Sequence, residues 1–387
     1  MFTESGAMKI CFLSSLYSNK EMGGGVPPYI SNLSRALARR GHTITIVTSG
    51  RPGSIYKEGP VAVVCAGTTQ IFSKTLHLLD PVRLWQRLYF MLNAAIYIMR
   101  NDFDLVEVPD AGFEHLLLNF HRHFPVVVKM HSDVTEHRQL RMRPIFNFAE
   151  KVTLMTADGL SALSNSSADY FAEKYSIPRN SISVIPLGIE PDTHLCATDV
   201  KAKYGLNNRK VVLYVGRLDR RKGIETLKIL ASKMTVRNEI KFVVIGSNLE
   251  GFDIETLSPN ILYLGRLSKD ELFSFYRECD LFFHPSKFET FGLSILEAML
   301  CGRPILAADA VGTRDLVTDG KNGYLFNMAD TGDLIDKFNR LMGDPELRER
   351  FGRESLSMAK QYDIKNIAKR TEEFFLEVIC AWKRKRK

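Results

Sequence analysis

Short apolar runs alternate along the chain with longer segments in which apolar residues recur at helical spacing. Continuous apolar strands separated by helices are typical of parallel sheets that are covered on both faces. The pattern therefore predicts an α/β protein. In the first half of the chain the expected strands are MKICFLSS (8–15), HTITIVTS (42–49), VAVVCA (61–66), DLVEVP (104–109), PVVVKMH (125–131), GLSALSN (159–165) and ISVIPLG (182–188).

The same alternation starts again in the second half. Its expected strands are KVVLYVGRL (210–218), KFVVIGS (241–247), ILYLGRL (261–267), DLFFHPS (280–286), RPILAAD (303–309) and NGYLF (322–326). The segment between the two series, 187–209, is polar and punctuated by Gly and Pro, which predicts a linker. We therefore expect two doubly wound Rossmann-like domains facing a central cleft, 1–190 and 191–363. A C-terminal helix, 364–387, is expected to pack back on the first domain and to end in a basic tail.

Two helical segments deserve separate interpretations. After the first strand, Pro27 and Pro28 suit the first turn of a helix, and Gly41 suits its C-terminal stop. Residues 83–100 read RLWQRLYFMLNAAIYIMR, which we interpret as a buried amphipathic helix, with contact to a membrane surface as the alternative. No uncharged apolar run reaches the roughly 18 residues that a membrane-spanning helix needs.

Charge argues against nucleic acid as a partner. The formal net charge is +8, but residues 1–190 carry an excess of only three basic residues. The remainder carries an excess of five, which equals the contribution of the terminal KRKRK (383–387). Such a tail is either a solvated end or a segment attracted to anionic lipid headgroups.

Cysteine usage and the N-terminus indicate the compartment. The six cysteines are scattered singly without a CxxC pair, which favours reduced thiols and argues against a zinc site. No basic region followed by an apolar stretch and a cleavage site opens the sequence. The expected location is cytoplasmic, with the inner face of the cytoplasmic membrane as the expected place of any membrane contact.

The motif GRLDRRKG (216–223) follows an expected strand and opens a helix. Arg217 and Lys222 then lie beside a helix N-terminus, where backbone N–H groups already favour anions. Two cations there suit a diphosphate leaving group without a metal ion. The alternative interpretation is a solvated basic loop.

Two further features lie at strand ends in the first half. The glycine-rich stretch 23–25, with Gly24 and Gly25, is either a bare turn or a loop that a ligand approaches closely. It is not a GxGxxG fingerprint, and HTITIVTS ends without an acidic residue, which argues against a nicotinamide cofactor. His131 ends the strand VVVKMH; it is either a satisfied strand-end imidazole or a group facing the cleft.

The stretch FETFGLSILEAM (288–299) carries one carboxylate before a helix and another within it. The segment Gly292-Leu293-Ser294 can begin that helix, with its N–H groups directed at an anion. Glu289 can accept hydrogen bonds from sugar hydroxyls, and Glu297 can hold a vicinal diol such as a ribose. Glu pairs at this spacing also occur by chance on helix surfaces.

Together these motifs resemble family 4 of the retaining glycosyltransferases, which have the GT-B fold. The resemblance runs from the first strand to about residue 327. It rests on the loop 23–25 with RALARRGHTITIVT behind it, His131, VIPLGIE (184–190), GRLDRRKG, YLGRLSKDEL (263–272) and HPSKFETFGLSILEAMLCGRPIL (284–306), which contains the E-x7-E spacing of the family. Leu187 stands where the family usually has Asn, and residues 311–315 (VGTRD) replace the usual GGxPE.

The resemblance implies transfer of a hexosyl unit from a UDP- or GDP-sugar to a carbohydrate or glycolipid hydroxyl, with no cofactor and no metal. The first domain would bind the acceptor and the second the donor. The donor diphosphate would contact Arg217 and Lys222, the ribose Glu297, and the base Arg266 and Leu267. The transferred sugar would contact Glu289 and the segment Phe291-Gly292-Leu293, with His131 beside the anomeric centre.

Three alternatives compete with this hypothesis. Asp102-Phe103-Asp104 is formally the DxD of a metal-dependent GT-A enzyme, but it falls before a strand rather than after one. A GT-B sugar-nucleotide epimerase would need several acid and base groups near the sugar. A non-catalytic sugar-nucleotide-binding protein would have no need of the expected catalytic residues, which are His131, Glu289, Arg217 and Lys222. The sequence leaves the sugar, the nucleotide, the acceptor, the linkage and the oligomeric state open.

Overall fold

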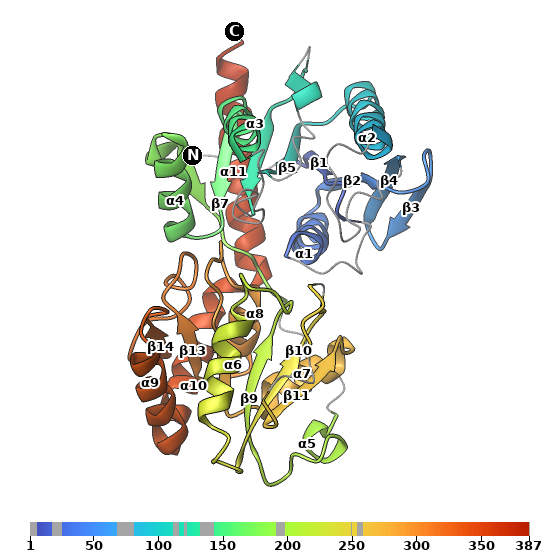
Figure 1. Ribbon diagram of the computed structural model, residues 1–387. Coiled ribbons are helices and arrows are strands. Elements are labelled where there is room, and N and C mark those ends of the chain that lie inside the picture. Colours follow the sequence, from blue (N-terminus) through green and yellow to red (C-terminus); the bar gives the residue numbers. More distant parts are fainter. Residues whose placement is uncertain are drawn as a thin grey trace. The chain divides into compact units, whose positions relative to one another are not determined.

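The computed structural model describes residues 6–17, 25–67, 81–110, 116–119, 122–131, 143–190, 198–248, 250–253 and 258–386. The chain forms two compact units (Figure 1). Unit 1 combines Met1–Glu190 with Ile364–Lys387, and unit 2 is Pro191–Asp363. Within the part of the chain that is described, no helix is both long enough and apolar enough to cross a membrane.

The described part of unit 1 has an eight-stranded sheet with the order β3-β4-β2-β1-β5-β6-β7-β8. All its neighbouring strands pair in parallel except β3 and β4. The strands are β1 Lys9–Leu13, β2 Thr43–Ser49, β3 Ile55–Glu58, β4 Val61–Gly67, β5 Leu105–Pro109, β6 Val126–Met130, β7 Gly159–Ala162 and β8 Ile182–Val184. The helices are α1 Val26–Arg39, α2 Pro81–Arg100, α3 Arg143–Met155, α4 Asn165–Tyr175 and α11 Ile364–Arg384, with 3-10 turns at Leu116–Asn119 and Arg179–Ser181.

The described part of unit 2 has a six-stranded parallel sheet with the order β11-β10-β9-β12-β13-β14. Its strands are β9 Lys210–Val215, β10 Ile240–Ile245, β11 Ile261–Gly265, β12 Leu281–His284, β13 Ile305–Ala308 and β14 Gly323–Phe326. The helices are α5 Val200–Lys203, α6 Ile224–Lys233, α7 Lys269–Glu278, α8 Leu293–Leu300, α9 Thr331–Gly343 and α10 Pro345–Ala359, followed by a 3-10 turn at Lys360–Tyr362.

The predicted α/β class and the two doubly wound sheets are thus confirmed, but β3 was missed. Its sequence, IYKE, is short and half polar, and its residues are exposed or half-buried. It pairs with β4 through a tight turn at Gly59, whose φ is +61°. An edge strand of this kind is fixed by its partner strand rather than by an apolar pattern of its own.

Helix α1 begins and ends where its sequence indicates. Pro27 and Pro28 lie in the first turn, and Gly41 follows the last with a φ of +96°. Leu33 and Leu37 are fully buried, so the apolar stripe of the helix lies against the core.

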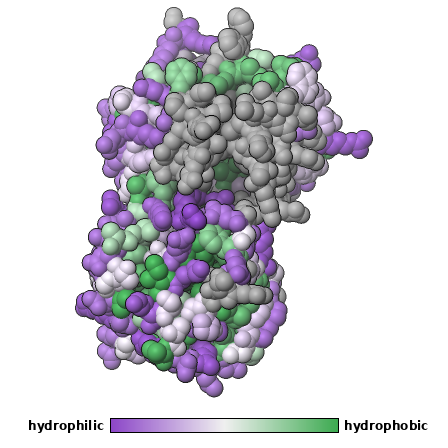
Figure 2. Space-filling model, in the orientation of Figure 1, coloured by the Kyte–Doolittle hydropathy of each residue, from purple (hydrophilic) through white to green (hydrophobic). Residues whose placement is uncertain are grey.

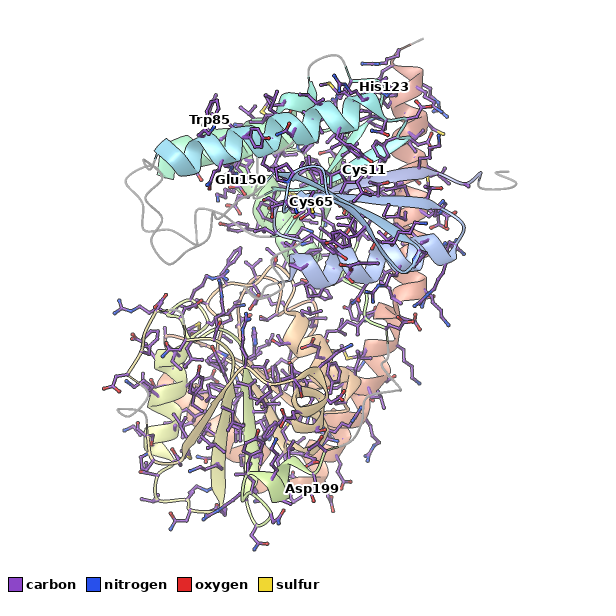
Figure 3. All side chains as sticks on the ribbon, turned by 90° about the vertical axis from the view of Figure 1, so that its right-hand side faces the viewer. Cys11, Cys65, Trp85, His123, Glu150 and Asp199 are labelled. Carbon is purple, nitrogen blue, oxygen red and sulfur yellow. The ribbon has the colours of Figure 1, made fainter. Side chains whose placement is uncertain are left out.

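Helix α2 is apolar on two sides. Phe90, Ala94 and Ile98 are fully buried on the side that faces the sheet. The other side leaves apolar side chains exposed at helical spacing, namely Trp85, Leu88, Tyr89 and Leu92. Figure 3 shows Trp85 pointing away from the sheet, and Figure 2 shows apolar surface at the end of unit 1 where α2 and α3 lie. The interpretation as a buried amphipathic helix therefore holds for one side only.

Helix α11 completes unit 1 from the far end of the sequence. Its Val378 and Phe374 lie so close to Gly159 that an added Cβ there would come within 2.6 Å of Val378. The N–H of Ile364 donates to the carbonyl of Ile189 at 3.1 Å. Gly188 is packed against Ile364 in the same way, with 2.7 Å to an added Cβ.

The interpretation of residues 187–209 as one linker was too broad. Residues 187–190 are part of unit 1, because Leu187 and Ile189 are buried there and Ile189 bonds to α11. At the other end, α5 and the buried Leu206 belong to unit 2. The polar, Gly/Pro-rich composition of 187–209 did not indicate these contacts, because only a few apolar side chains in the segment make them.

Candidate active site

The predicted donor residues of unit 2 lie where the strand order reverses. Strands β9 and β12 are parallel neighbours at the centre of the sheet, and the chain leaves their carboxyl ends in opposite directions. Loops that separate in this way open a crevice at the sheet edge, where doubly wound proteins bind ligands. The loop 216–223 follows β9 and the loop 285–292 follows β12.

The loop after β9 is held in shape by its own polar groups. The Asp219 carboxylate accepts a hydrogen bond from the Lys222 N–H at 2.7 Å, and the Tyr214 hydroxyl donates to the Arg217 carbonyl at 2.8 Å. Gly223 has a φ of +76°, and an added Cβ would lie 1.9 Å from the Pro285 carbonyl oxygen. Only glycine therefore lets this loop contact the loop after β12.

Lys222, Glu289 and His284 form a buried cluster between the two loops. The Lys222 ammonium pairs with Oε1 of Glu289, and Nε2 of His284 lies 3.1 Å from the same oxygen. The three side chains are 18%, 12% and 5% exposed. Oε2 of Glu289 has no partner among the residues that the structure describes, so it remains available as an acceptor.

Burial raises the pKa of the Glu289 carboxyl, but Lys222 and His284 outweigh burial, and the pKa lies well below its usual range. Burial also lowers the pKa of the Lys222 ammonium, and Glu289 opposes that shift. We conclude that the pair is ionised at neutral pH, because each charge stabilises the other inside the protein.

Arg217 lies beside this cluster, and of its guanidinium nitrogens only Nε has a partner among the described residues. Its Nε is 3.4 Å from the Asp219 carboxylate, and the side chain is 35% exposed. Its two terminal nitrogens make no hydrogen bond within the described ranges. These two N–H₂ groups can therefore bind an anion at the crevice.

The helix α8 begins at Leu293, as the sequence predicts, with Gly292 before it in a left-handed conformation, φ +96°. Leu293 and Ser294 form its first turn, so their N–H groups are directed out of the helix end. The Phe291 side chain is buried, with its ring centroid 5.5 Å from that of Tyr362. Only the backbone of Phe291 is thus left for a ligand.

The segment 311–315 keeps one glycine where the approach of two chains requires it. Gly312 has a φ of +79°, and an added Cβ would lie 2.6 Å from the Glu289 carbonyl oxygen. The Glu289 N–H donates to the Val311 carbonyl at 3.3 Å. This segment therefore supports the backbone of 289–291 even though its sequence departs from the usual pattern.

Glu297 lies within α8 and, like Glu289, is half-buried. Oε2 of Glu297 accepts a hydrogen bond from the Tyr276 hydroxyl at 2.7 Å, which joins α8 to α7. Burial raises the pKa of the Glu297 carboxyl to about 7, although Tyr276 and Lys269 both favour the ionised form. Glu297 is thus a carboxyl that changes its charge near neutral pH.

Arg266 and Leu267 follow β11, which lies two strands away from β9 in the same sheet. Arg266 is exposed and Leu267 is half-buried. They therefore share the carboxyl edge of the sheet with Arg217 and Glu289.

The predicted residues of unit 1 lie at the ends of β6 and α1. Gly24 falls outside the described residues, and Gly25 is the N-cap of α1 with an ordinary φ of −80°. His131 follows β6 and is 9% exposed. Its ring contacts Tyr29 of α1, with 4.7 Å between the ring centroids.

Sequence reasoning missed several partners of these residues. They are Asp219, Tyr276 and His284 in unit 2 and Tyr29, Glu107 and Lys129 in unit 1. Two signals were available: His284 ends a strand five residues before Glu289, and Lys129 interrupts the apolar strand VVVKM. A charged residue within a buried strand needs a partner, and that requirement points to a buried polar cluster.

The Asp102-Phe103-Asp104 segment has a structural explanation. Oδ2 of Asp104 accepts a hydrogen bond from the Lys9 N–H at 2.7 Å, and the Asp104 N–H donates to the Lys9 carbonyl at 2.8 Å. Asp104 thus fixes the start of β5 against β1. Nowhere in the described ranges do three His, Cys, Asp or Glu side chains gather as a metal site would require.

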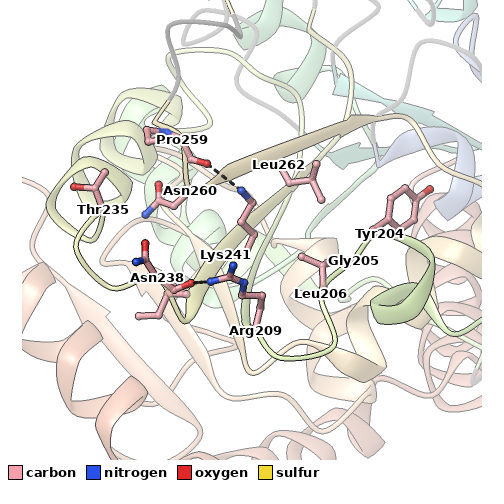
Figure 4. Close-up of a pocket in the computed structure, with 11 residues that line it drawn as sticks. Tyr204, Gly205, Leu206, Arg209, Thr235, Asn238, Lys241, Pro259, Asn260 and Leu262 are labelled. Carbon is pink, nitrogen blue, oxygen red and sulfur yellow. Dashed lines mark hydrogen bonds between the residues drawn. The ribbon is translucent and has the colours of Figure 1, made fainter.

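A cavity of about 380 Å³ in unit 2 contains none of the predicted residues (Figure 4). It lies at the amino ends of β9, β10 and β11, at the edge of the sheet opposite to Arg217 and Glu289. Its two cations already bond to backbone carbonyls, Arg209 to Asn238 and Lys241 to Pro259. The cavity is therefore separate from the crevice described above.

Comparison with known proteins agrees with the resemblance. Residues 23–193 match the model of Glycosyltransferase Family 4, and residues 197–358 match that of Glycosyl transferases group 1. The chain belongs to the family 4, group 1 glycosyltransferases.

Two curated relatives illustrate the sequence similarity. The alpha-D-kanosaminyltransferase of Streptomyces kanamyceticus is 29% identical over 58% of this chain. The GDP-mannose-dependent alpha-mannosyltransferase of Corynebacterium glutamicum is 37% identical over 32% of this chain. The aligned segments span 63% and 29% of these relatives' own lengths.

Solved structures show the fold. The sucrose-phosphate synthase of Thermosynechococcus elongatus matches with a TM-score of 0.80 at 22% identity, over 97% of this chain and 100% of that one. The Anabaena protein HepE in complex with UDP-glucose matches with a TM-score of 0.73 at 20% identity, over 97% and 100%. The predicted GT-B fold is thereby confirmed.

Proposed function

We propose that the chain is a retaining glycosyltransferase that moves a hexosyl unit from a UDP- or GDP-sugar to the hydroxyl of a carbohydrate or glycolipid acceptor. The observation that carries the proposal is the meeting of Arg217, Lys222 and Glu289 at the switch point of unit 2, beside the first turns of α6 and α8. Similar proteins support both nucleotides: the Corynebacterium glutamicum mannosyltransferase depends on GDP-mannose, and the Anabaena structure contains UDP-glucose.

Arg217 and Lys222 stabilise the departing diphosphate. In the reaction the bond from the anomeric carbon to the phosphate oxygen breaks, and the acceptor oxygen bonds to that carbon on the same face. The proton of the acceptor hydroxyl passes to an oxygen of the leaving phosphate, so no nucleophile from the protein is required. The two cations and the N–H groups at 292–294 stabilise the charge that develops on the phosphate.

Glu289 and Glu297 divide the recognition of the donor. Oε2 of Glu289 accepts hydrogen bonds from hydroxyls of the transferred sugar, while Lys222 and His284 keep the carboxylate ionised and oriented. Glu297 accepts the two hydroxyls of the ribose, with Tyr276 fixing its carboxylate. Arg266 and Leu267 border the base, and the backbone of Phe291, Gly292 and Leu293 contacts the sugar.

Unit 2 is proposed to hold the donor and unit 1 the acceptor. By the family resemblance, Gly24 and Gly25 would contact the donor, and His131 would act beside the anomeric centre. No cofactor and no metal ion takes part, because the two cations neutralise the charge that a divalent ion would otherwise balance.

A transfer assay with a panel of UDP- and GDP-sugars tests the proposal. One donor should yield a glycosylated acceptor whose anomeric proton shows the same configuration as the donor sugar. Conversion of the donor into an epimeric nucleotide sugar would instead identify an epimerase. Donor binding detected by thermal shift, with neither transfer nor hydrolysis, would identify a non-catalytic binding protein.

Membrane contact is a second, separable part of the proposal. The exposed apolar stripe of α2, Trp85, Leu88, Tyr89 and Leu92, suits the interfacial region of a bilayer, and the basic end of α11 suits anionic headgroups. On this proposal the protein acts in the cytoplasm at the inner face of the membrane. Sedimentation with vesicles containing anionic lipid should carry the protein down, and Trp85→Ser with Leu92→Ser should prevent it. Equal sedimentation of both proteins would contradict the proposal.

A further inference from the structure

In unit 1, His131 belongs to a buried polar cluster that also contains Tyr29, Glu107 and Lys129. Lys129 is completely buried, and Glu107, Tyr29 and His131 are 3%, 4% and 9% exposed. In the parallel pair β5–β6, Glu107 is in register with Val127, and alternate residues along β6 put Val127, Lys129 and His131 on the same side of the sheet. Helix α1 brings Tyr29 to this side.

Tyr29 contacts all three of the other side chains. Its hydroxyl donates to Oε1 of Glu107 at 2.6 Å, and the ammonium of Lys129 lies 4.9 Å from the centre of its ring. The imidazole of His131 meets the same ring edge-on, at 4.7 Å and 60°. The Lys129 ammonium also donates to the carbonyl of Ile185 at 2.9 Å.

An ammonium group at the buried position 129 is energetically unfavourable. Taking a charge out of water is unfavourable, and well-packed apolar side chains of similar size usually serve stability as well as a buried ionic pair does. The neighbouring residues of β6, Val126, Val127, Val128 and Met130, are apolar and fully buried. A charge retained among them therefore suggests a role in function.

We propose that Lys129 is a positioning residue for His131: anchored on the Ile185 carbonyl and on the Tyr29 ring, it fixes the imidazole and places a positive charge behind it. The role of His131 rests on the proposed function. The arrangement of the cluster does not, since all its contacts are present within unit 1 without a substrate.

Burial and the Lys129 charge together keep the imidazole neutral. Burial, together with the Lys129 ammonium, lowers the pKa of His131 to about 3. Burial lowers the pKa of Lys129 to about 8, and Glu107 opposes that shift, so the ammonium is still charged at neutral pH. The described charged or titratable groups around the imidazole and its cluster come from β5, β6, α1 and α11: Glu107, Asp110, Lys129, Tyr29 and Arg370.

Neutrality suits the chemistry proposed for the site. The anomeric carbon gains positive charge as the donor bond breaks, so an imidazolium beside it would oppose the reaction. A neutral imidazole can exchange hydrogen bonds with sugar hydroxyls without adding charge. Lys129 thus acts through His131 and has no contact of its own with the substrate.

Titration of His131 by NMR in histidine-labelled protein tests the inference without any substrate. His131→Asn identifies the signal among those of the nine histidines. In the double variant Glu107→Gln/Lys129→Met, which removes both charges together, the pKa of His131 should rise by about one unit or more. In Glu107→Gln and in Lys129→Arg, which keep the cation, it should stay low.

The pH profile of transfer gives the second readout. In a Glu297→Gln background, which removes the acidic limb that Glu297 would set near pH 7, the remaining acidic limb of kcat/KM should move to higher pH in the double variant and should stay in place in Lys129→Arg. An unchanged pKa of His131 in a double variant that is folded by circular dichroism would overturn the inference. If the NMR shift occurs but no donor is turned over, the inference about Lys129 stands and the proposed function is wrong.

Discussion

Tyr276 of α7 donates a hydrogen bond of 2.7 Å to Oε2 of Glu297 in α8. The bond links two helices that pack on the same side of unit 2, and it holds a carboxyl whose pKa burial has raised to about 7. The proposed ribose contact therefore depends on a group that is only partly ionised at neutral pH. A donor site with such a carboxyl should respond to modest changes in pH.

The affinity for UDP or GDP should fall as pH is lowered through 7. The ionised carboxylate accepts two hydroxyls, whereas the protonated acid has given up one acceptor position. In Tyr276→Phe the ionised form loses a hydrogen bond, so the pH midpoint of binding should move upward. Calorimetry between pH 5.5 and 8.5 would measure both, with Glu297→Gln as the control that removes this pH dependence. A profile in Glu297→Gln identical to that of the wild type would contradict the assignment.

The two glutamates should differ in kinetics and in binding. Glu297 is proposed to hold the ribose, which is unchanged during the reaction, so Glu297→Gln should raise the donor KM more than it lowers kcat. Glu289 contacts the transferred sugar, so Glu289→Gln should act mainly on kcat. Because the free nucleoside diphosphate lacks that sugar, its affinity should drop in Glu297→Gln and hardly change in Glu289→Gln. Equal weakening in both variants would show that the division of roles is wrong.

Lys222→Ala should lower turnover by orders of magnitude, since loss of one group that stabilises the transition state typically costs about 3 kcal/mol. Removing the ammonium also leaves Glu289 buried without its partner, so stability must be measured by thermal unfolding at the same time. Lys233→Ala, at the far end of α6 on an exposed side chain, is the matched control and should behave as the wild type. Near-normal turnover in a folded Lys222→Ala protein would show that Lys222 does not stabilise the departing diphosphate.

Transfer should persist in an excess of chelator, because Arg217 and Lys222 are proposed to balance the diphosphate charge. Complete loss that manganese or magnesium restores would favour a metal-dependent mechanism. Asp104→Asn separates the two cases further: it should weaken the bond to Lys9 and lower the melting temperature slightly, with kcat unchanged at temperatures where the protein is folded.

Phe375→Ala in α11 should destabilise unit 1 by roughly 3–5 kcal/mol, because it removes a fully buried aromatic side chain and leaves a cavity. Glu373→Ala on the exposed side of the same helix is the control and should stay within about 0.5 kcal/mol. Urea unfolding would measure the difference. Equal stability of the two variants would mean that α11 does not belong to the core of unit 1.

The fold was predictable because its strands carry their signal locally. KVVLYV and IKFVVI, for example, are apolar enough to be strands in almost any context, and both are buried in the sheet of unit 2. The edge strand β3 has no such signal and depends on its pairing with β4. The contacts of 187–190 with α11 involve residues far apart in sequence, so composition alone suggested a linker instead.

The candidate site was predictable only where a motif names both residue and spacing. Lys222, Glu289 and Gly292 could be placed at helix starts in this way, and the structure has them there. The roles of Tyr276 and Lys129 could not be predicted, because each depends on contacts with residues that are distant in the sequence. Nothing in the sequence around a tyrosine in an amphipathic helix indicates that its hydroxyl will bond to a buried carboxyl.

The bond between Ile189 and Ile364 also bears on the order in which the protein is made. A ribosome completes residues 1–190 long before it reaches α11, so during synthesis the newly made part of unit 1 lacks the helix that covers Gly159 and Gly188. Residues 191–363, by contrast, are contiguous and can fold as soon as they emerge. The second unit is thus expected to complete its fold first, and the first unit to complete its core only when α11 has been made.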